Sequence, residues 1–222
     1  SASYTPADPI HDSYHEAAYV LQKLKQVGDA AQSMSYWVFT DIFEESAPRF
    51  TPFHGGFGML NTQGINKPVF YAYQFLNQLG KTELVNDDNM SWACKDEQGN
   101  VQILAYDFTY TLPDSINNQV YYIRDLPAKD KGKLRVNIAG MPEGNYSLQV
   151  YQVGYRVNDA YTTYFDLGRP NQLTRQQVEQ IKKINSGTPV AAEIVRVKKG
   201  EPLIKELIMR ENDVYLLSFI KL

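Results

Sequence analysis

Residues 33–41 read SMSYWVFTD, a run in which small or apolar side chains occupy both alternating faces. Such a run is typical of a strand that is buried on both sides in a parallel sheet. A single strand of this kind cannot satisfy the hydrogen-bonding groups along its own two edges. The sequence therefore predicts that residues 33–41 form a strand whose neighbours belong to a larger sheet.

Helical patterns lie on either side of this run. The stretch from Ser13 to Gly28 begins with the capping-box pattern Ser-Tyr-His-Glu16 and continues with apolar residues on one helical face. Pro68 begins a second apolar helix, which ends near Gly80. The resulting order of helix, strand, long loop and helix is the unit of an α/β barrel, in which the loops after the strands build the active site.

The pattern of residues changes after Glu83. Short runs rich in β-branched and aromatic residues alternate with turn clusters such as Gly140–Asn145, as in antiparallel sheets. There are enough such runs for a two-sheet sandwich. The predicted strands are Met90–Lys95, Val101–Phe108, Gln119–Arg124, Lys133–Ile138, Tyr146–Tyr155, Ala191–Val197, Leu203–Met209 and Val214–Ile220.

The predicted fold is therefore mixed. Residues 1–80 are expected to be the C-terminal remnant of a TIM (β/α)8 barrel catalytic domain. Residues 81–222 are expected to form an antiparallel β-sandwich accessory domain. One helix, at about residues 174–184, interrupts the strands, because a second capping-box pattern begins at Thr174 and an apolar stripe follows it.

The charge and the apolar content of the chain argue against nucleic acid and membranes as partners. The net charge is −3 at pH 7, and both signs are scattered along the chain, so no basic stripe is present to meet nucleic acid or an anionic membrane surface. No apolar run approaches the roughly 20 residues needed to cross a bilayer. Residues 1–12 lack the charged and apolar regions of a secretory signal, which leaves the compartment open.

No metal or organic cofactor is expected. Cys94 is the only cysteine, which excludes a site built from several cysteines. His11 and His15 lie close together in the sequence, but they lack a third ligand and the HExxH pattern of zinc enzymes. The sequence also contains no phosphate loop and no dinucleotide fingerprint.

The long loop after the predicted strand gathers acidic, histidine and glycine residues. Paired carboxylates carry out glycoside hydrolysis, but retaining enzymes hold theirs roughly 5–5.5 Å apart on opposite sides of the scissile bond. The adjacent residues Glu44 and Glu45 are therefore better suited to accept hydrogen bonds from sugar hydroxyls, and a solvated acidic turn is the alternative. His54 can bind a hydroxyl or orient a carboxylate, although a histidine beside two glycines is more often structural.

Several motifs resemble glycoside hydrolase family 39 β-xylosidases. SYWVFTDIFEE (35–45), FHGGFGM (53–59) and GINKP (64–68) resemble the last barrel strand and loop of that family. SASYTPADPIHD (1–12) resembles the segment after the family's nucleophile strand, and YTTYFDLGRP (161–170) resembles part of its C-terminal sandwich. The resemblance covers nearly the whole chain.

The resemblance implies retaining hydrolysis of a terminal β-linked xylose through a covalent glycosyl-enzyme. In such enzymes the nucleophile precedes the segment that the start of this chain resembles, and the acid/base glutamate lies on the fourth strand, so no catalytic residue is expected here. By resemblance, Tyr4 lies beside the nucleophile and Trp37 lies under the bound sugar. Glu44 and Glu45 hold xylose hydroxyls, and His54 is a weaker member of the same substrate-binding set.

The expected function is that of the C-terminal portion of a retaining β-xylosidase. Its expected partners are xylose or a xylo-oligosaccharide and the missing N-terminal barrel segment or polypeptide, with no nucleic acid and no membrane. Two alternatives stay open: a free-standing carbohydrate-binding or scaffold module, and a related family 39 enzyme that acts on another sugar, such as an α-iduronidase. The sequence does not determine the oligomeric state.

Overall fold

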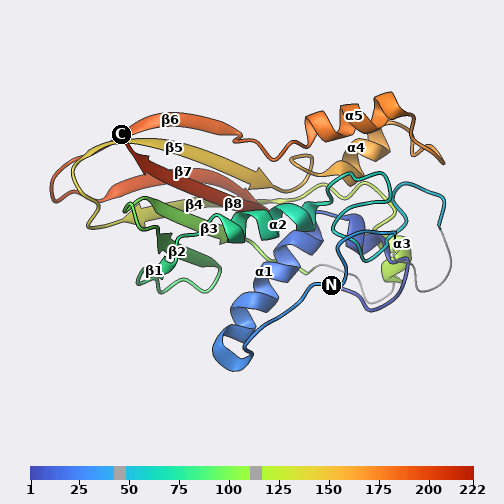
Figure 1. The fold of residues 1–222 in the computed structure, drawn as a ribbon, viewed down its shortest axis with the longest axis horizontal. Helices are drawn as coiled ribbons and strands as arrows, with labels where there is room; N and C mark the ends of the chain where they lie inside the picture. Colours follow the sequence, from blue (N-terminus) through green and yellow to red (C-terminus); the bar gives the residue numbers. More distant parts are fainter. Residues whose placement is uncertain (43–48, 111–116) are drawn as a thin grey trace.

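The computed structural model describes residues 1–42, 49–110 and 117–222 and is organised around a six-stranded antiparallel sheet in the order β1-β2-β3-β8-β5-β6 (Figure 1). A second antiparallel sheet consists of β4 and β7. Of the strands predicted after Glu83, all except Gln119–Arg124 are confirmed. The strands are β1 (Thr82–Glu83), β2 (Ser91–Lys95), β3 (Val101–Tyr106), β4 (Asp130–Ile138), β5 (Gly144–Val153), β6 (Ala191–Val197), β7 (Leu203–Arg210) and β8 (Val214–Lys221).

The central strands β3 and β8 are buried on both faces. Ile103 is paired with Leu217, and both pack toward the small sheet, where Val136 of β4 belongs to the same core. The adjacent pair, Leu104 and Leu216, belongs to a second core on the opposite face. Because side chains alternate along a strand, neighbouring residues serve different cores. This arrangement is the two-layer sandwich that the strand pattern predicts, with an additional helical layer.

Two helices cover the face of the large sheet that points away from β4 and β7 (Figure 1). They are α1 (His15–Val27) and α2 (Pro68–Asn77), and both were predicted from their apolar periodicity. Ala17 of α1 and Phe75 of α2 are fully buried in the second core. Residues from the first 80 positions therefore pack directly on the sandwich sheet.

Two further helices lie together at one end of the molecule, α4 (Ala160–Asp166) and α5 (Arg175–Ile184). The capping box predicted for α5 is confirmed, with its reciprocal bonds between Thr174 and Gln177. Helix α4, which the Asp159 side chain caps, was not predicted from the sequence. A third core joins both helices to Phe53 and Ile65 from the long loop. No helix in the described parts of the chain is long and apolar enough to span a membrane.

The capping box predicted at Ser13 and Glu16 is wrong. A 3-10 turn, Pro9–Asp12, precedes α1, and the Ser13 hydroxyl donates to a carbonyl of that turn at 2.8 Å. The fully buried Glu16 carboxylate instead accepts hydrogen bonds from the Ala2 amide at 2.9 Å and the Tyr36 hydroxyl at 3.2 Å. A buried carboxylate needs donors, and those available to Glu16 come from distant segments.

Residues 33–41 do not form the predicted doubly buried strand. Most of their side chains are exposed or only partly buried. The β-type pairing described for this run is a single parallel bridge between Thr40 and Leu60. Loop residues supply the remaining backbone bonds, as when the Val38 amide donates to the Phe57 carbonyl at 2.9 Å. The run has the composition of a buried strand, but a strand also needs neighbours along its edges.

The strand predicted at Gln119–Arg124 is also wrong, because a short helix, α3 (Asn118–Tyr121), occupies this position. The Asn117 side chain accepts a hydrogen bond from the Gln119 amide at 2.8 Å. The Asn117 carbonyl accepts two more bonds, from the amides at positions 120 and 121. Local bonds of this kind compete with strand pairing, so they outweigh the strand propensity of the valine and tyrosines.

We expect the amides of residues 33–36 to exchange with solvent much faster than those of β3 and β8. The backbone bonds described for this segment begin at Val38, whereas β3 and β8 are each paired on both sides. Exchange protection in a protein ranges from almost none in loosely bonded segments to the full unfolding free energy in core strands. Hydrogen–deuterium exchange of the monomer tests this expectation, and equal protection of the two regions would contradict it.

Candidate functional site

The five predicted substrate-binding residues differ in their exposure, and two of them are not described by the structure. Glu44 and Glu45 lie outside the described residues. Tyr4 is 94% exposed and Trp37 is 54% exposed, so both rings face solvent in this chain. The His54 ring is partly buried, with Nδ1 at 3.0 Å from the Thr51 carbonyl oxygen. The roles given to these five residues remain predictions.

A buried ion network lies beneath this region. The Lys67 ammonium is fully buried and lies 2.7 Å from Asp12 Oδ1 and 2.7 Å from Asp41 Oδ2. It also donates to the Gly56 carbonyl at 2.9 Å. Lys67 immediately precedes α2, Asp12 ends the turn before α1, and Asp41 ends the exposed run. One ammonium group therefore joins three segments that are far apart in the sequence.

The same carboxylates hold the glycine loop. The Gly55 amide donates to Asp12 Oδ2 at 2.6 Å, and the Gly58 amide donates to Asp41 Oδ1 at 2.7 Å. A Cβ on Gly56 would lie only 2.4 Å from Asp41 Oδ1, and one on Gly58 only 2.3 Å from the Asp41 amide nitrogen. The Gly-Gly-Phe-Gly sequence is therefore required for the loop backbone to approach the carboxylates.

Burial and ion pairing oppose each other in this network. Burial alone lowers the pKa of Lys67, but Asp12 and Asp41 outweigh it, so the pKa of Lys67 is raised and the ammonium stays charged at neutral pH. Burial raises the pKa of Asp41, Lys67 partly reverses that shift, and Asp12 adds to it. The negative charges of both buried carboxylates are balanced by the same lysine ammonium group.

His11 forms a second connection in the same place. Its fully buried ring has Nδ1 at 2.7 Å from the Gly55 carbonyl oxygen and Nε2 at 2.9 Å from the Ser3 carbonyl oxygen. The ring also lies against Phe57, with a centroid distance of 4.6 Å. His11 thus connects the segment that carries Tyr4 to the loop that carries His54.

Sequence reasoning missed the residues that organise this region. His11 was considered only as a metal ligand, and Asp12, Asp41 and Lys67 were given no role. One available signal was a lysine directly before the apolar helix that begins at Pro68, because a lysine that is buried at such a junction needs acidic partners. The sequence could not show which carboxylates would meet it.

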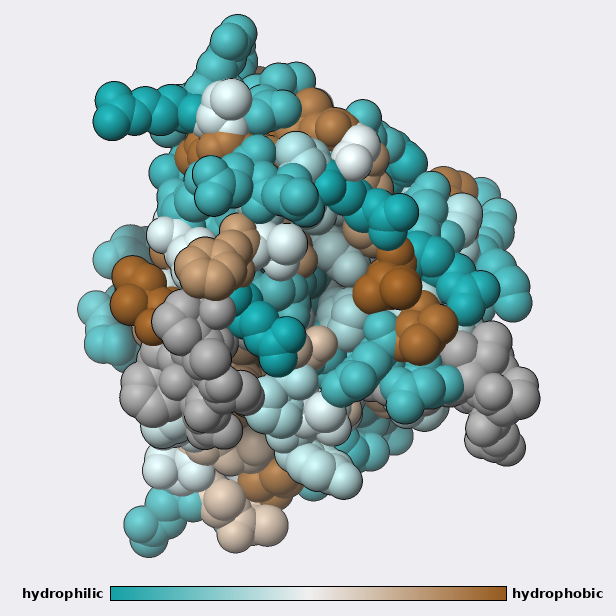
Figure 2. Space-filling view, turned by 90° about the vertical axis from the view of Figure 1, so that its right-hand side faces the viewer, coloured by the Kyte–Doolittle hydropathy of each residue, from teal (hydrophilic) through white to brown (hydrophobic). Residues whose placement is uncertain are grey.

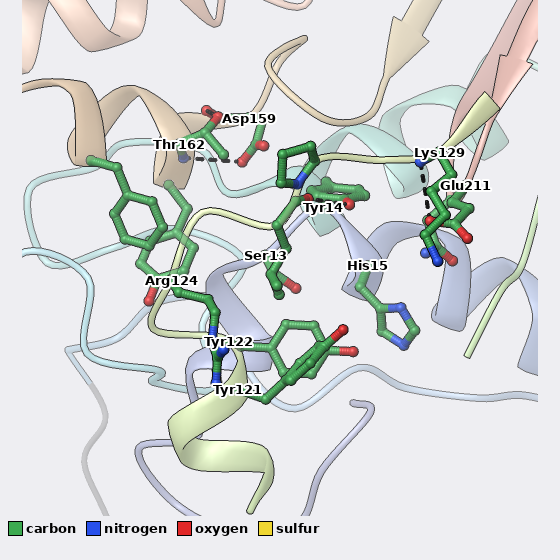
Figure 3. A pocket seen from close by; sticks show the side chains of 15 residues that line it. Ser13, Tyr14, His15, Tyr121, Tyr122, Arg124, Lys129, Asp159, Thr162 and Glu211 are labelled. Carbon is green, nitrogen blue, oxygen red and sulfur yellow. Dashed lines mark hydrogen bonds between the residues drawn. The ribbon is translucent and has the colours of Figure 1, made fainter. Parts of the chain in front are cut away.

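A pocket of about 390 Å³ lies beside the start of α1, and Tyr121 and Tyr122 reach into it from the α3 segment (Figure 3). The Tyr14 hydroxyl on its wall donates to a backbone carbonyl at 2.8 Å, and Asp159 caps α4. Burial lowers the pKa of His15 to about 4, which keeps its ring neutral at pH 7. Within the described parts of the chain, His15 Nε2 has no hydrogen-bond partner. The lining of the pocket mixes aromatic, aliphatic, polar and charged side chains, and several of its polar groups already serve the fold.

The buried carboxylates described in the structure are all engaged in bonds that support the fold. A carboxylate that attacks a sugar or transfers a proton must instead face the substrate. Among the described residues, no group of three or more His, Cys, Asp or Glu side chains is placed to hold a metal ion. The engaged carboxylates are Asp8, Asp12, Glu16, Asp41, Asp107, Asp159 and Asp213.

The end of the molecule that carries α3, α4 and α5 faces the viewer in Figure 2. Apolar side chains there form separate groups among hydrophilic ones. A sugar ring presents both apolar C–H faces and hydroxyl groups, so a surface of this mixed kind can contact both.

We expect Lys67→Met to lower the free energy of unfolding by about 3–5 kcal/mol, because it leaves two buried carboxylates without their cation. Lys81→Met is the matched control: the Lys81 ammonium lies 3.5 Å from Glu97, and the two side chains are 88% and 77% exposed. That variant should change the free energy by less than about 1 kcal/mol. Urea denaturation of both variants measures the difference, and equal effects would show that the network does not stabilise the fold.

Comparison with known sequences gives a consistent result. A sequence model of the family described as "Glycosyl hydrolases family 39" matches residues 1–199. A β-xylosidase from Geobacillus stearothermophilus is 28% identical over 181 residues, which make up 82% of this chain and 33% of that protein. The chain thus spans about a third of the length of the curated relatives it matches.

Solved structures extend the similarity to the whole chain. The GH39 enzyme from Xanthomonas axonopodis pv. citri matches with a TM-score of 0.94 and 40% identity, covering 100% of this chain and 44% of that one. A monomeric β-xylosidase from Caulobacter crescentus CB15 matches with a TM-score of 0.93 and 40% identity, with the same coverage of 100% and 44%. Because the family model matches most of its length, this chain belongs to glycosyl hydrolase family 39.

Proposed function

We propose that this chain is the C-terminal portion of a retaining β-xylosidase. Residues 1–80 would complete an α/β barrel, and residues 81–222 would form its accessory β-sandwich. Relatives named as β-xylosidases are 28%, 29% and 40% identical to the chain, which covers only 33%, 35% and 44% of their respective lengths. The nucleophile and the acid/base group would belong to the remainder.

The observation that carries this proposal is the exposure of large apolar side chains around the 33–41 run. Phe39 is 62% exposed and Phe50 is 81% exposed, and Tyr4 and Trp37 also face solvent. Exposing such rings to water carries a cost, and we propose that they belong to a surface that binds another part of the protein or a ligand. Neighbouring barrel strands would bury some of these rings, and a bound sugar would cover others.

In the proposed reaction, one carboxylate of the remainder attacks the anomeric carbon while another protonates the leaving oxygen, and water then hydrolyses the glycosyl-enzyme. This chain would bind and orient the sugar. Trp37 would lie under its ring, Glu44 and Glu45 would accept bonds from its hydroxyls, and Tyr4 and His54 would complete the wall. The Lys67 network supports this assignment because it anchors the loop segments on both sides of the two glutamates.

The two alternatives receive less support. A free-standing carbohydrate-binding or scaffold module would not explain why the exposed rings lie in a run with the composition of a buried strand. An enzyme for another sugar is less favoured because relatives named as β-xylosidases match at up to 40% identity. We therefore propose xylose or a xylo-oligosaccharide as the ligand.

We expect this chain alone to show no turnover of an aryl β-xyloside above background, because both reacting carboxylates would be missing. The protein completed with its barrel portion should turn over in the ordinary enzyme range, about 1 to 10³ per second. Parallel assays of the two proteins test this expectation. Turnover in that range by the chain alone would show that the reacting groups lie within it.

We expect Glu44→Gln or Glu45→Gln, made in the completed protein, to lower kcat/KM by roughly 10- to 100-fold. This is the effect of losing a charge-assisted hydrogen bond worth about 1.5–3 kcal/mol. Because charge develops on the sugar in the transition state, kcat should fall as well as binding. Glu201→Gln, at an exposed glutamate paired with Lys198, is the control and should retain full activity.

Full activity of both site variants would instead support the solvated acidic turn. A loss as large as that from deleting a nucleophile, several powers of ten, would show that one of these glutamates reacts directly.

A further inference from the structure

His11 makes two hydrogen bonds that restrict its protonation state. Nδ1 lies 2.7 Å from the Gly55 carbonyl oxygen, and Nε2 lies 2.9 Å from the Ser3 carbonyl oxygen. A carbonyl oxygen only accepts hydrogen bonds. A neutral imidazole has one N–H group and one lone pair, so it can donate to one of these oxygens but directs its lone pair at the other. Both contacts are favourable only when each ring nitrogen carries a proton.

We propose that His11 is held as an imidazolium cation and that its two N–H groups clamp the first residues of the chain to the 53–58 loop. His11 would thereby be a positioning residue for the sugar-binding wall. The positioning role rests on the function proposed above, because Ser3 adjoins Tyr4 and Gly55 adjoins His54. The protonation state follows from the two carbonyl contacts and does not depend on that function.

The groups around the ring are consistent with a buried cation. The Phe57 ring lies 4.6 Å away between centroids, a separation at which an aromatic face can stabilise positive charge. Burial raises the pKa of the Glu16 carboxyl, and the charge of His11 partly lowers it again. Ionisable groups on the elements packed around His11 include Asp8 and Asp12 in its own turn, Glu16 in α1, Asp41, His54 and Lys67 across the loop, and Tyr121 and Tyr122 in the α3 segment.

The clamp is specific for one residue of the loop, Gly55. His11 binds the Gly55 carbonyl, while the next residue, Asp12, accepts a hydrogen bond from the Gly55 amide at 2.6 Å. A Cβ at Gly55 would lie 2.3 Å from the carbonyl carbon of Asp8, and its φ is +74°, so only glycine suits this position. Two consecutive side chains thus fix both sides of Gly55.

The protonation state can be measured directly. The chain has 3 histidines, so labelling them with ¹⁵N gives three ring spin systems, and long-range ¹H–¹⁵N correlations show which nitrogens carry protons. His11→Gln assigns the His11 signals. At pH 7 we expect two protonated nitrogens in His11 and one in His15, whose buried ring is neutral. A His11 ring with a single protonated nitrogen at pH 7 would overturn the proposal, and the measurement requires no enzymatic activity.

Amide exchange tests the clamp itself. At pH 6, His11→Phe should speed exchange of the Gly55 amide relative to wild type by about 10- to 100-fold, which is the effect of losing a charge-assisted hydrogen bond. The ratio of the two rates cancels the intrinsic exchange rate of the Gly55 amide. His15→Phe is the matched control and should leave Gly55 unchanged. A ratio near one would show that His11 does not clamp the loop.

Discussion

A single buried ammonium group holds the first third of this chain together. Lys67 bonds to Asp12, Asp41 and the Gly56 carbonyl, so it fixes the turn before α1, the end of the 33–41 run and the glycine loop at once. Burying three charges is costly, and such a network persists only where its bonds are nearly complete. Its geometry therefore restricts the backbone far more than an apolar contact of similar size would.

The β-sheet layer supplies the rigid support on which this network lies. Strands β3 and β8 are paired on both edges and buried on both faces, so each contributes to two cores. Helices α1 and α2 pack on one face, and two members of the ion network, Asp12 and Lys67, lie just before their first turns. The position of the loops is thus set by helices that the sheet holds in place.

In the proposed enzyme, one part of the protein positions the sugar and another part supplies the reacting carboxylates. The buried carboxylates described in the structure hold loops and cap helices, and the exposed groups near the loops are aromatic or polar. Such a surface can position a sugar, and in the proposed enzyme the groups that react with it belong elsewhere. Separating positioning from chemistry permits the reacting carboxylates to approach from opposite sides of the glycosidic bond. A barrel whose loops converge on one face provides that geometry.

The sequence by itself determined most of the sandwich strands, both long helices and the capping box of α5, because alternation, helical periodicity and caps are local properties. Its motifs also pointed to family 39. Only the tertiary structure decided that residues 33–41 stay largely exposed and that Lys67 meets Asp12 and Asp41. The physical reason is that strand pairing and the compensation of buried charge depend on groups far apart in the sequence, and no local pattern specifies which of them meet.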